Sequence, residues 1–139
     1  MENVETMRKY LRSLGIEVLE IKPPINSDVF CIELSDYRWG AMRMGQEQPN
    51  VEFVKYKYMF GFDGNYCLVN MEGRSGQTHR DRGIINSQGV EAISPYFCDT
   101  IYDFYNKGKS YIKYVRNGWE FKVDKNNIHN IFSKTQVNM

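Results

Sequence analysis

The sequence lacks long apolar runs and carries little cysteine, histidine or proline. Its 139 residues include three Cys, two His and four Pro. No stretch approaches the roughly 18 to 20 apolar residues that a membrane-spanning helix needs. The N-terminal segment MENVETMRKYLRSLG is polar and has no apolar signal-peptide core. We therefore expect a cytoplasmic protein, in a bacterial cell or a phage-infected host, that does not bind a membrane.

The few cysteines and histidines argue against a metal site or a disulfide framework. Cys31, Cys67 and Cys98 are widely spaced and odd in number, which indicates free, buried thiols in a reducing compartment. A zinc site needs about four ligands at close spacing. No two Cys or His residues lie within ten positions of each other. We therefore predict no metal and no cofactor.

Catalytic sets are equally scarce. Cys98 could pair with His79 as nucleophile and base, but nothing in their spacing requires it. The segment Glu20-Ile21-Lys22 has the acid-x-Lys order of metal-dependent nucleases, without a clear upstream strand acid, which that chemistry also needs. We therefore assign no catalytic residue.

The abundant residue types indicate one globular domain over residues 1–139. Hydrophobic residues make up 42% and charged residues 25%, ordinary values for a folded domain of this length. Aromatic residues, at 14%, favour strands over helical bundles. The net charge is only +1, but residues 105–139 hold seven Lys/Arg against two Asp/Glu, whereas residues 1–50 hold six against eight. The C-terminal part is therefore basic.

Apolar periodicity predicts an N-terminal helix and then a series of strands. Met7, Leu11 and Leu14 recur at helical spacing before Gly15, which predicts a helix over residues 2–14. Alternating or continuous apolar runs predict strands. These cover residues 16–21, 28–34, 51–60 and 66–71, and the stretches between 35 and 50 and between 72 and 89 have no regular pattern.

A second helix is predicted over residues 94–107. Ser94 is a suitable N-cap, and Pro95 suits the first helical turn. Ile101 and Phe104 belong to an apolar stripe at helical spacing, which one face of a sheet would bury.

The strongest turn signal is Asn117-Gly118, which predicts a type I′ hairpin turn between strands at 110–116 and 119–123. We also expect a short helix at 127–132. The order of elements predicts an α+β fold, with a mostly antiparallel sheet of about six strands, an N-terminal helix and the central helix 94–107 packed on it.

The polar loop that follows residue 72 is the first candidate site. Guanidinium groups, hydroxyls and backbone N–H groups are suited to binding a phosphate or a carboxylate. The alternative is a solvated surface loop. The candidate anion- or partner-binding residues are Arg74, Ser75, Thr78, His79, Arg80 and Arg82.

A second candidate is the segment DYRWGAMRMGQ. Its Trp, Tyr, Met and Arg residues have the composition of a hot spot for a protein partner. The alternative is a segment that covers one edge of the sheet. The candidate residues are Tyr37, Arg38, Trp39, Met42, Arg43 and Met44.

The predicted hairpins interleave basic and aromatic residues. Such a surface can stack single-stranded bases on Tyr while cationic side chains neutralise phosphates. Half-buried Tyr packing with Lys in water explains the same pattern. The candidate nucleic-acid-binding residues are Lys55, Lys57, Lys113 and Arg116.

Because no catalytic set emerges, we expect a small non-enzymatic binding protein. The composition, rich in Lys, Asn, Ile and Tyr, is typical of an AT-rich bacterial or phage genome. Our first hypothesis is a phage or mobile-element inhibitor that binds a bacterial defence component, with a protein as partner. The alternative is a module that binds nucleic acid or a nucleotide, and the third is a metal-dependent phosphodiesterase or nuclease.

Overall fold

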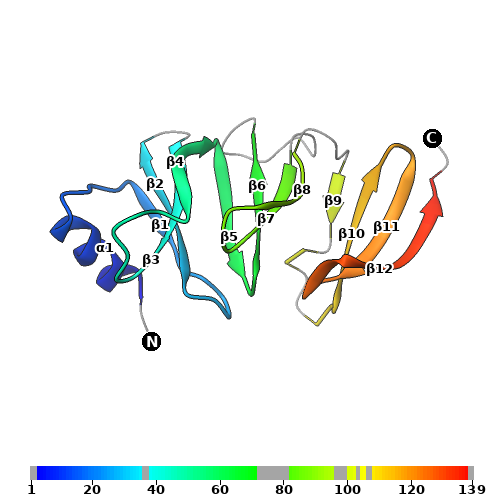
Figure 1. Cartoon of the computed structure of the whole chain (residues 1–139), viewed down its shortest axis with the longest axis horizontal. Helices are drawn as coiled ribbons and strands as arrows, with labels where there is room; N and C mark the ends of the chain where they lie inside the picture. The colour runs from blue at the N-terminus through cyan, green and yellow to red at the C-terminus, as the bar shows by residue number, and fades with distance from the viewer. Residues whose placement is uncertain are drawn as a thin grey trace.

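The computed structural model describes residues 3–35, 38–71, 82–95, 100–102, 104–105 and 108–137. Within them, the helix α1 (Val4–Ser13) precedes twelve strands in three four-stranded antiparallel sheets (Figure 1). Sheet A consists of β1 (Glu20–Lys22), β2 (Val29–Ser35), β3 (Arg38–Arg43) and β4 (Val51–Tyr56). Sheet B consists of β5 (Tyr58–Asp63), β6 (Tyr66–Asn70), β7 (Arg82–Asn86) and β8 (Glu91–Ile93). Sheet C, in the order β12-β11-β10-β9, consists of β9 (Thr100–Tyr102), β10 (Tyr111–Arg116), β11 (Trp119–Asp124) and β12 (Asn127–Gln136).

The helix α1 forms as predicted. The side chain of Asn3 accepts a 2.8 Å hydrogen bond from the backbone N–H of Thr6, which satisfies one of the free donors at the helix start. Met7 and Leu11 are fully buried against sheet A. Gly15 follows the helix with a φ of 80°, a left-handed conformation that glycine adopts readily.

Sheet A is buried on both faces because successive residues of β2 enter different cores. Val29 and Cys31 pack in a cluster shared with sheet B. Phe30 and Ile32 pack in a cluster shared with α1. This alternation follows from the two-residue period of a strand.

Sheet B is also buried on both faces, with sheet A packed on one face and sheet C on the other. In β6, Cys67 belongs to the cluster shared with sheet A, whereas Leu68 belongs to the cluster shared with sheet C. Sheet C contributes Ile112 and Val123 to that second cluster. The layers therefore follow one another as α1, sheet A, sheet B and sheet C along the long axis (Figure 1).

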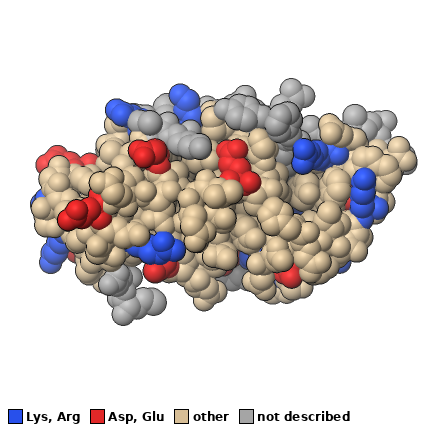
Figure 2. Space-filling model, viewed as in Figure 1, with Lys and Arg blue, Asp and Glu red and all other residues tan. Residues whose placement is uncertain are grey.

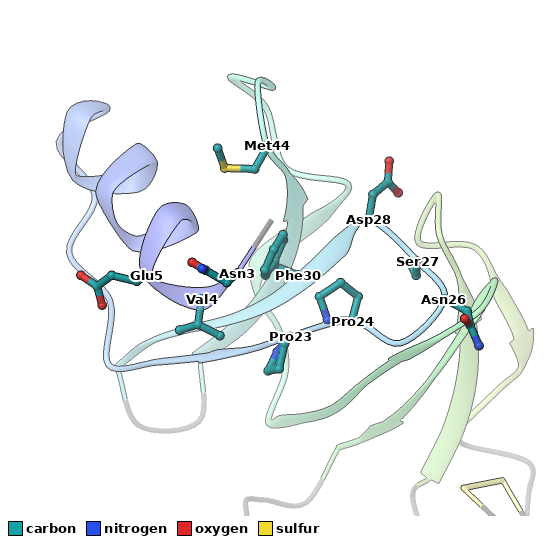
Figure 3. Close-up of a pocket in the computed structure, with 10 residues that line it drawn as sticks. All are labelled: Asn3, Val4, Glu5, Pro23, Pro24, Asn26, Ser27, Asp28, Phe30 and Met44. Atoms are coloured by element: carbon teal, nitrogen blue, oxygen red, sulfur yellow. The ribbon is translucent and has the colours of Figure 1, made fainter. Parts of the chain in front are cut away.

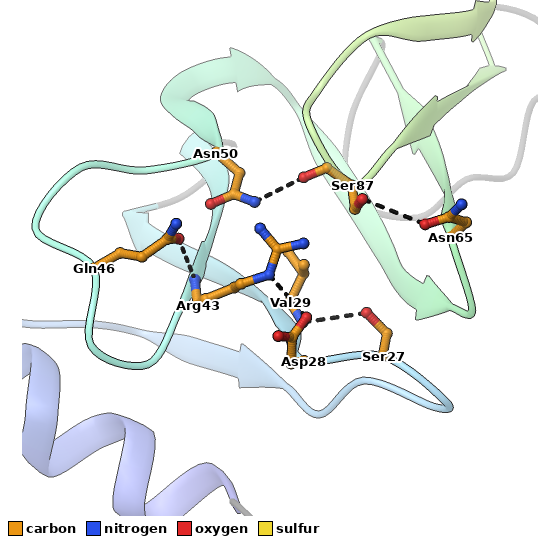
Figure 4. A network of polar contacts seen from close by, with 8 residues as sticks. All are labelled: Ser27, Asp28, Val29, Arg43, Gln46, Asn50, Asn65 and Ser87. Atoms are coloured by element: carbon orange, nitrogen blue, oxygen red, sulfur yellow. Dashed lines mark hydrogen bonds and ion pairs between the residues drawn. The ribbon is translucent and has the colours of Figure 1, made fainter.

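Polar contacts tie the edges of sheets A and B together (Figure 4). Asn50, just before β4, donates a 2.7 Å hydrogen bond from its side-chain amide to the carbonyl of Ser87, just after β7. The hydroxyl of Ser87 is in turn 3.4 Å from Oδ1 of Asn65. Ile25 also hydrogen-bonds through its backbone to Phe62 and Gly64 of the β5–β6 hairpin.

The prediction of an α+β fold with about six strands and a central helix at 94–107 is wrong. The described residues of that range include β9, which pairs with β10 so that Ile101 lies opposite Tyr114. Ile101 and Phe104 are both buried in the cluster between sheets B and C. A β-branched and aromatic Thr-Ile-Tyr run fits a strand, and tertiary pairing overrides the capping signal of Ser94-Pro95.

The short helix expected at 127–132 is also wrong. These residues begin β12, which pairs along β11 with two register irregularities near Val123. Ile128 is buried, and its N–H donates to the hydroxyl of Tyr66 in sheet B. Pairing with the neighbouring strand therefore prevails over a weak local helix signal.

Other strand boundaries differ from the prediction. The strand expected at 16–21 is shorter and lies later in the chain, because only β1, at residues 20–22, forms there. The stretch between residues 35 and 50, for which no regular pattern was found, contains β3. The long strand expected at 51–60 divides at Lys57 into β4 and β5, which belong to different sheets. The N–H of Lys57 donates to the carbonyl of Asn70 at the end of β6, so the chain has already joined sheet B at this residue. The stretch from 72 to 89 contains β7.

Candidate functional site

The outer face of sheet C carries a row of tyrosine and lysine side chains. In the β10–β11 hairpin, Lys113 lies directly opposite Lys122, and on its other side Lys113 lies opposite Tyr102 of β9. Directly opposed residues share one face of an antiparallel sheet. The flanking residues Ile112 and Val123 are buried on the inner face, so this row faces outward and is half-buried.

Tyr111, at the start of β10, lies at the centre of three lysines. Lys109 donates a 2.6 Å hydrogen bond from Nζ to the Tyr111 hydroxyl. The Nζ of Lys122 is 4.1 Å from the Tyr111 ring centroid, and the Nζ of Lys113 is 5.9 Å from it. We call Tyr102, Lys109, Tyr111, Lys113 and Lys122 the Lys–Tyr face.

The electrostatics of this face are dominated by positive charge. The hydrogen bond from Lys109 and the charges of the three lysines lower the pKa of Tyr111 from its ordinary value. The carboxylate of Glu120 partly offsets the positive charge of the lysines, because its Oε1 is 3.9 Å from Nζ of Lys113. The same carboxylate also accepts a hydrogen bond from the Tyr102 hydroxyl. Asp124 lies opposite Tyr111.

Sheet C as a whole carries an excess of positive charge, although Lys125 is paired with Asp63 of sheet B at 2.9 Å. The described residues and connections of sheet C, from residue 100 onward, contain six Lys/Arg and two Asp/Glu. Figure 2 shows Lys and Arg at both ends of the molecule, whereas Asp and Glu are fewer over the end that carries β10–β12. Near the tip of the β10–β11 hairpin, the Nζ of Lys134 lies 4.5 Å from the ring centroid of Trp119, which is 37% exposed.

Of the residues predicted to bind nucleic acid whose side chains the structure describes, one lies on the Lys–Tyr face. Lys113 belongs to the Lys–Tyr face, whereas Arg116 lies on the opposite face of β10, across from Trp119. Lys57 is exposed between β4 and β5, and the side chain of Lys55 is outside the described part of the structure. The sequence reasoning missed Lys122, although the register of a two-residue turn at Asn117-Gly118 already places it opposite Lys113.

Most of the predicted anion-binding loop lies outside the described residues. This applies to Arg74, Ser75, Thr78, His79 and Arg80.

Only Arg82 of that loop's candidates is described. Its guanidinium carbon is 5.3 Å from the Phe60 ring centroid, and burial lowers its pKa. The prediction that this loop binds an anion stays a prediction.

The segment predicted to contact a protein partner is strand β3 rather than an irregular loop. Trp39 and Met42 are fully buried on opposite faces of sheet A, while Arg38 is exposed. Arg43 is held by a 2.8 Å ion pair from Nε to Oδ1 of Asp28 (Figure 4).

Of the remaining residues of that candidate, Met44 lines a cavity and Tyr37 lies outside the described residues. Because Trp39 and Met42 are parts of the core, a partner would reach them only after sheet A opens. The hot-spot prediction itself is untested.

A cavity of about 990 Å³ lies between the start of α1 and the segment 23–28 (Figure 3). Val4, Phe30 and Met44 give it apolar walls, and Glu5 and Asp28 lie at its polar parts. The described residues that line it include no Lys or Arg, which disfavours an anionic ligand there.

Nothing in the described residues forms a metal centre. No group of three or more His, Cys, Asp and Glu side chains among them could hold a metal ion. Glu20 and Lys22 of the acid-x-Lys segment lie on β1 and form a 3.8 Å ion pair with each other.

Comparison with known proteins gives no family for the chain. A scan against protein-family models found no match, and neither did a search of the curated proteins. Among the described residues, the single helix is too short and too polar to cross a membrane.

Proposed function

We propose that the protein is a non-enzymatic binding protein whose Lys–Tyr face binds single-stranded nucleic acid. The observation that carries this proposal is the position of Lys113 directly opposite Lys122. The Tyr111 ring lies near both of these lysines and separates them from Lys109 along the face. Like charges at directly opposed positions destabilise a sheet. A bound phosphate backbone would remove that repulsion, since it supplies the opposite charge where the lysines meet.

The aromatic rings favour a single strand over a duplex. The rings of Tyr102 and Tyr111 are half-buried on the same face as the lysines. Unpaired bases can stack on such rings, and stacking contributes about 1 to 3 kcal/mol per base. In a duplex the bases are already stacked, so only the lysine–phosphate contacts would remain.

Salt-dependent binding of a labelled oligonucleotide tests the proposal. We expect the single strand to bind at low salt, with an affinity that falls as salt rises. The double variant Lys109→Gln/Lys122→Gln should bind at least about tenfold more weakly, because each charge-assisted contact contributes about 1.5 to 3 kcal/mol. The slope of log affinity against log salt should also fall by about 0.7 for each lost phosphate contact.

The matched control is Lys9→Gln/Arg12→Gln, which removes the same charge from two exposed residues of α1 at the other end of the stack. This variant should keep the affinity and the salt slope of the wild type. Equal losses in both double variants would show that binding depends on net charge alone and would refute a defined site.

A protein partner stays the competing hypothesis. An inhibitor of a bacterial defence component should recover one dominant protein from a bacterial lysate, with little dependence on salt. Recovery of such a protein by the Lys109→Gln/Lys122→Gln variant, together with no oligonucleotide binding by the wild type, would favour it over the proposal above.

A further inference from the structure

Two buried cysteines meet where sheet A packs on sheet B. Cys31 lies in β2, with Lys22 and Ala41 opposite it in the neighbouring strands. Cys67 lies in β6, with Phe62 and Ile85 opposite it. Both side chains are fully buried, and their Sγ atoms are 3.7 Å apart.

The pairing is tertiary rather than local. The two residues are 36 positions apart, and each belongs to a strand with neighbours on both sides. Their Sγ atoms need to approach by only about 1.7 Å to reach the length of a disulfide bond. A side-chain rotation and a small adjustment of the layers can supply such a movement.

We propose that Cys31 and Cys67 form a disulfide bond that clamps sheet A to sheet B when a disulfide oxidant, such as oxidised glutathione, reaches them. One thiolate attacks the oxidant and releases one reduced glutathione. The second thiolate then displaces the other glutathione from the mixed disulfide. The two cysteine thiols lose two hydrogens in total, and the oxidant becomes two molecules of reduced glutathione.

Burial determines when this reaction takes place. Because burial raises the pKa of Cys31, its thiol stays protonated in the folded protein and reacts slowly. The bond therefore forms mainly while the chain folds or while the two layers open. In a reducing cytoplasm the pair stays as two thiols.

Refolding in the variant Cys98→Ser, which removes the third thiol, tests the proposal. The protein is unfolded, then refolded with either oxidised or reduced glutathione. After the oxidised refolding we expect a mass lower by two hydrogens, no thiol that reacts in denaturant, and a peptide that joins β2 to β6. We also expect a Tm higher by about 5 to 15 °C, because the cross-link closes a long loop in the unfolded chain.

The controls add Cys31→Ser or Cys31→Ala to the same background. In these variants oxidised and reduced refolding should give the same Tm, and the alanine variant keeps the comparison valid if a buried serine prevents folding. The proposal is overturned if the Cys98→Ser protein, refolded with oxidised glutathione, keeps two reactive thiols or carries only glutathione adducts.

Discussion

The ammonium group of Lys109 donates a 2.6 Å hydrogen bond to the hydroxyl of Tyr111, two residues further along the chain. This contact and the neighbouring lysine charges lower the pKa of Tyr111. We expect Lys109→Met to raise that pKa toward the ordinary tyrosine value, because the hydrogen bond and one charge are lost. The measurement is the absorbance of tyrosinate against pH, and Tyr111→Phe identifies the transition by removing it.

The same titration predicts how oligonucleotide binding depends on pH. Tyr111 is neutral below its pKa and negative above it, so ionisation places a negative charge among the lysines. Affinity should therefore fall as the pH rises through the lowered pKa of Tyr111. In Tyr111→Phe this early decrease should be absent, and its persistence would show that another group causes it.

Replacing Lys122 by Glu separates binding from stability. Lys122→Glu puts opposite charges at the directly opposed positions of Lys113 and residue 122. We expect the free energy of unfolding to rise by about 0.2 to 1 kcal/mol, while oligonucleotide affinity falls. Denaturant unfolding and oligonucleotide titration measure the two effects. Lys122→Gln is the reference, because both variants lose the contact between Lys122 and the Tyr111 ring. A Lys122→Glu variant less stable than Lys122→Gln would contradict the repulsion that the proposed function rests on.

The hairpin turn of sheet C predicts a backbone effect. Asn117 and Gly118 have φ values of 54° and 79°, so the type I′ turn with two positive φ values is present as predicted. Gly118→Val should lower the free energy of unfolding by about 1 to 3 kcal/mol, because a β-branched residue is strained there. Thermal unfolding checks this, with Asn117→Gly as a control that should not destabilise the protein.

The core between sheets B and C predicts a packing effect at Phe104. This side chain is buried in the same cluster as Ile101, and Lys125 lies over its ring. Phe104→Ala should lower the free energy of unfolding by about 3 to 5 kcal/mol, because the cavity it leaves cannot fully collapse. Tyr105→Ala is a useful comparison, since Tyr105 is 39% exposed and should cost less. Equal costs would contradict the difference in burial.

Local patterns predicted those elements whose stabilising contacts are close along the chain. The spacing of Met7 and Leu11, with a glycine stop, identified α1 to within two residues at its start. The Asn117-Gly118 signal identified the β10–β11 hairpin and its register, because a two-residue turn aligns its own strands.

The same reasoning failed at residues 94–107, where local signals were ambiguous. The pattern of a helix is satisfied by Ser94, Pro95 and an apolar stripe. The β-branched and aromatic run at residues 100–102, which contains Ile101, is equally typical of a strand. The edge of β10, ten or more residues later, provides the backbone partners that stabilise β9. No local pattern contains that edge, since it forms only when the chain folds.

For the candidate site, the sequence by itself determined that Tyr111 and Lys113 share a face of a hairpin, because strand side chains alternate with a period of two. Only the tertiary structure decided that this face is the outward one. Sheet C buries Ile112 and Val123 against sheet B, at the end of the stack opposite α1. Which face of an amphipathic hairpin is covered depends on the layer packed against it, and that layer is made of residues distant in the sequence.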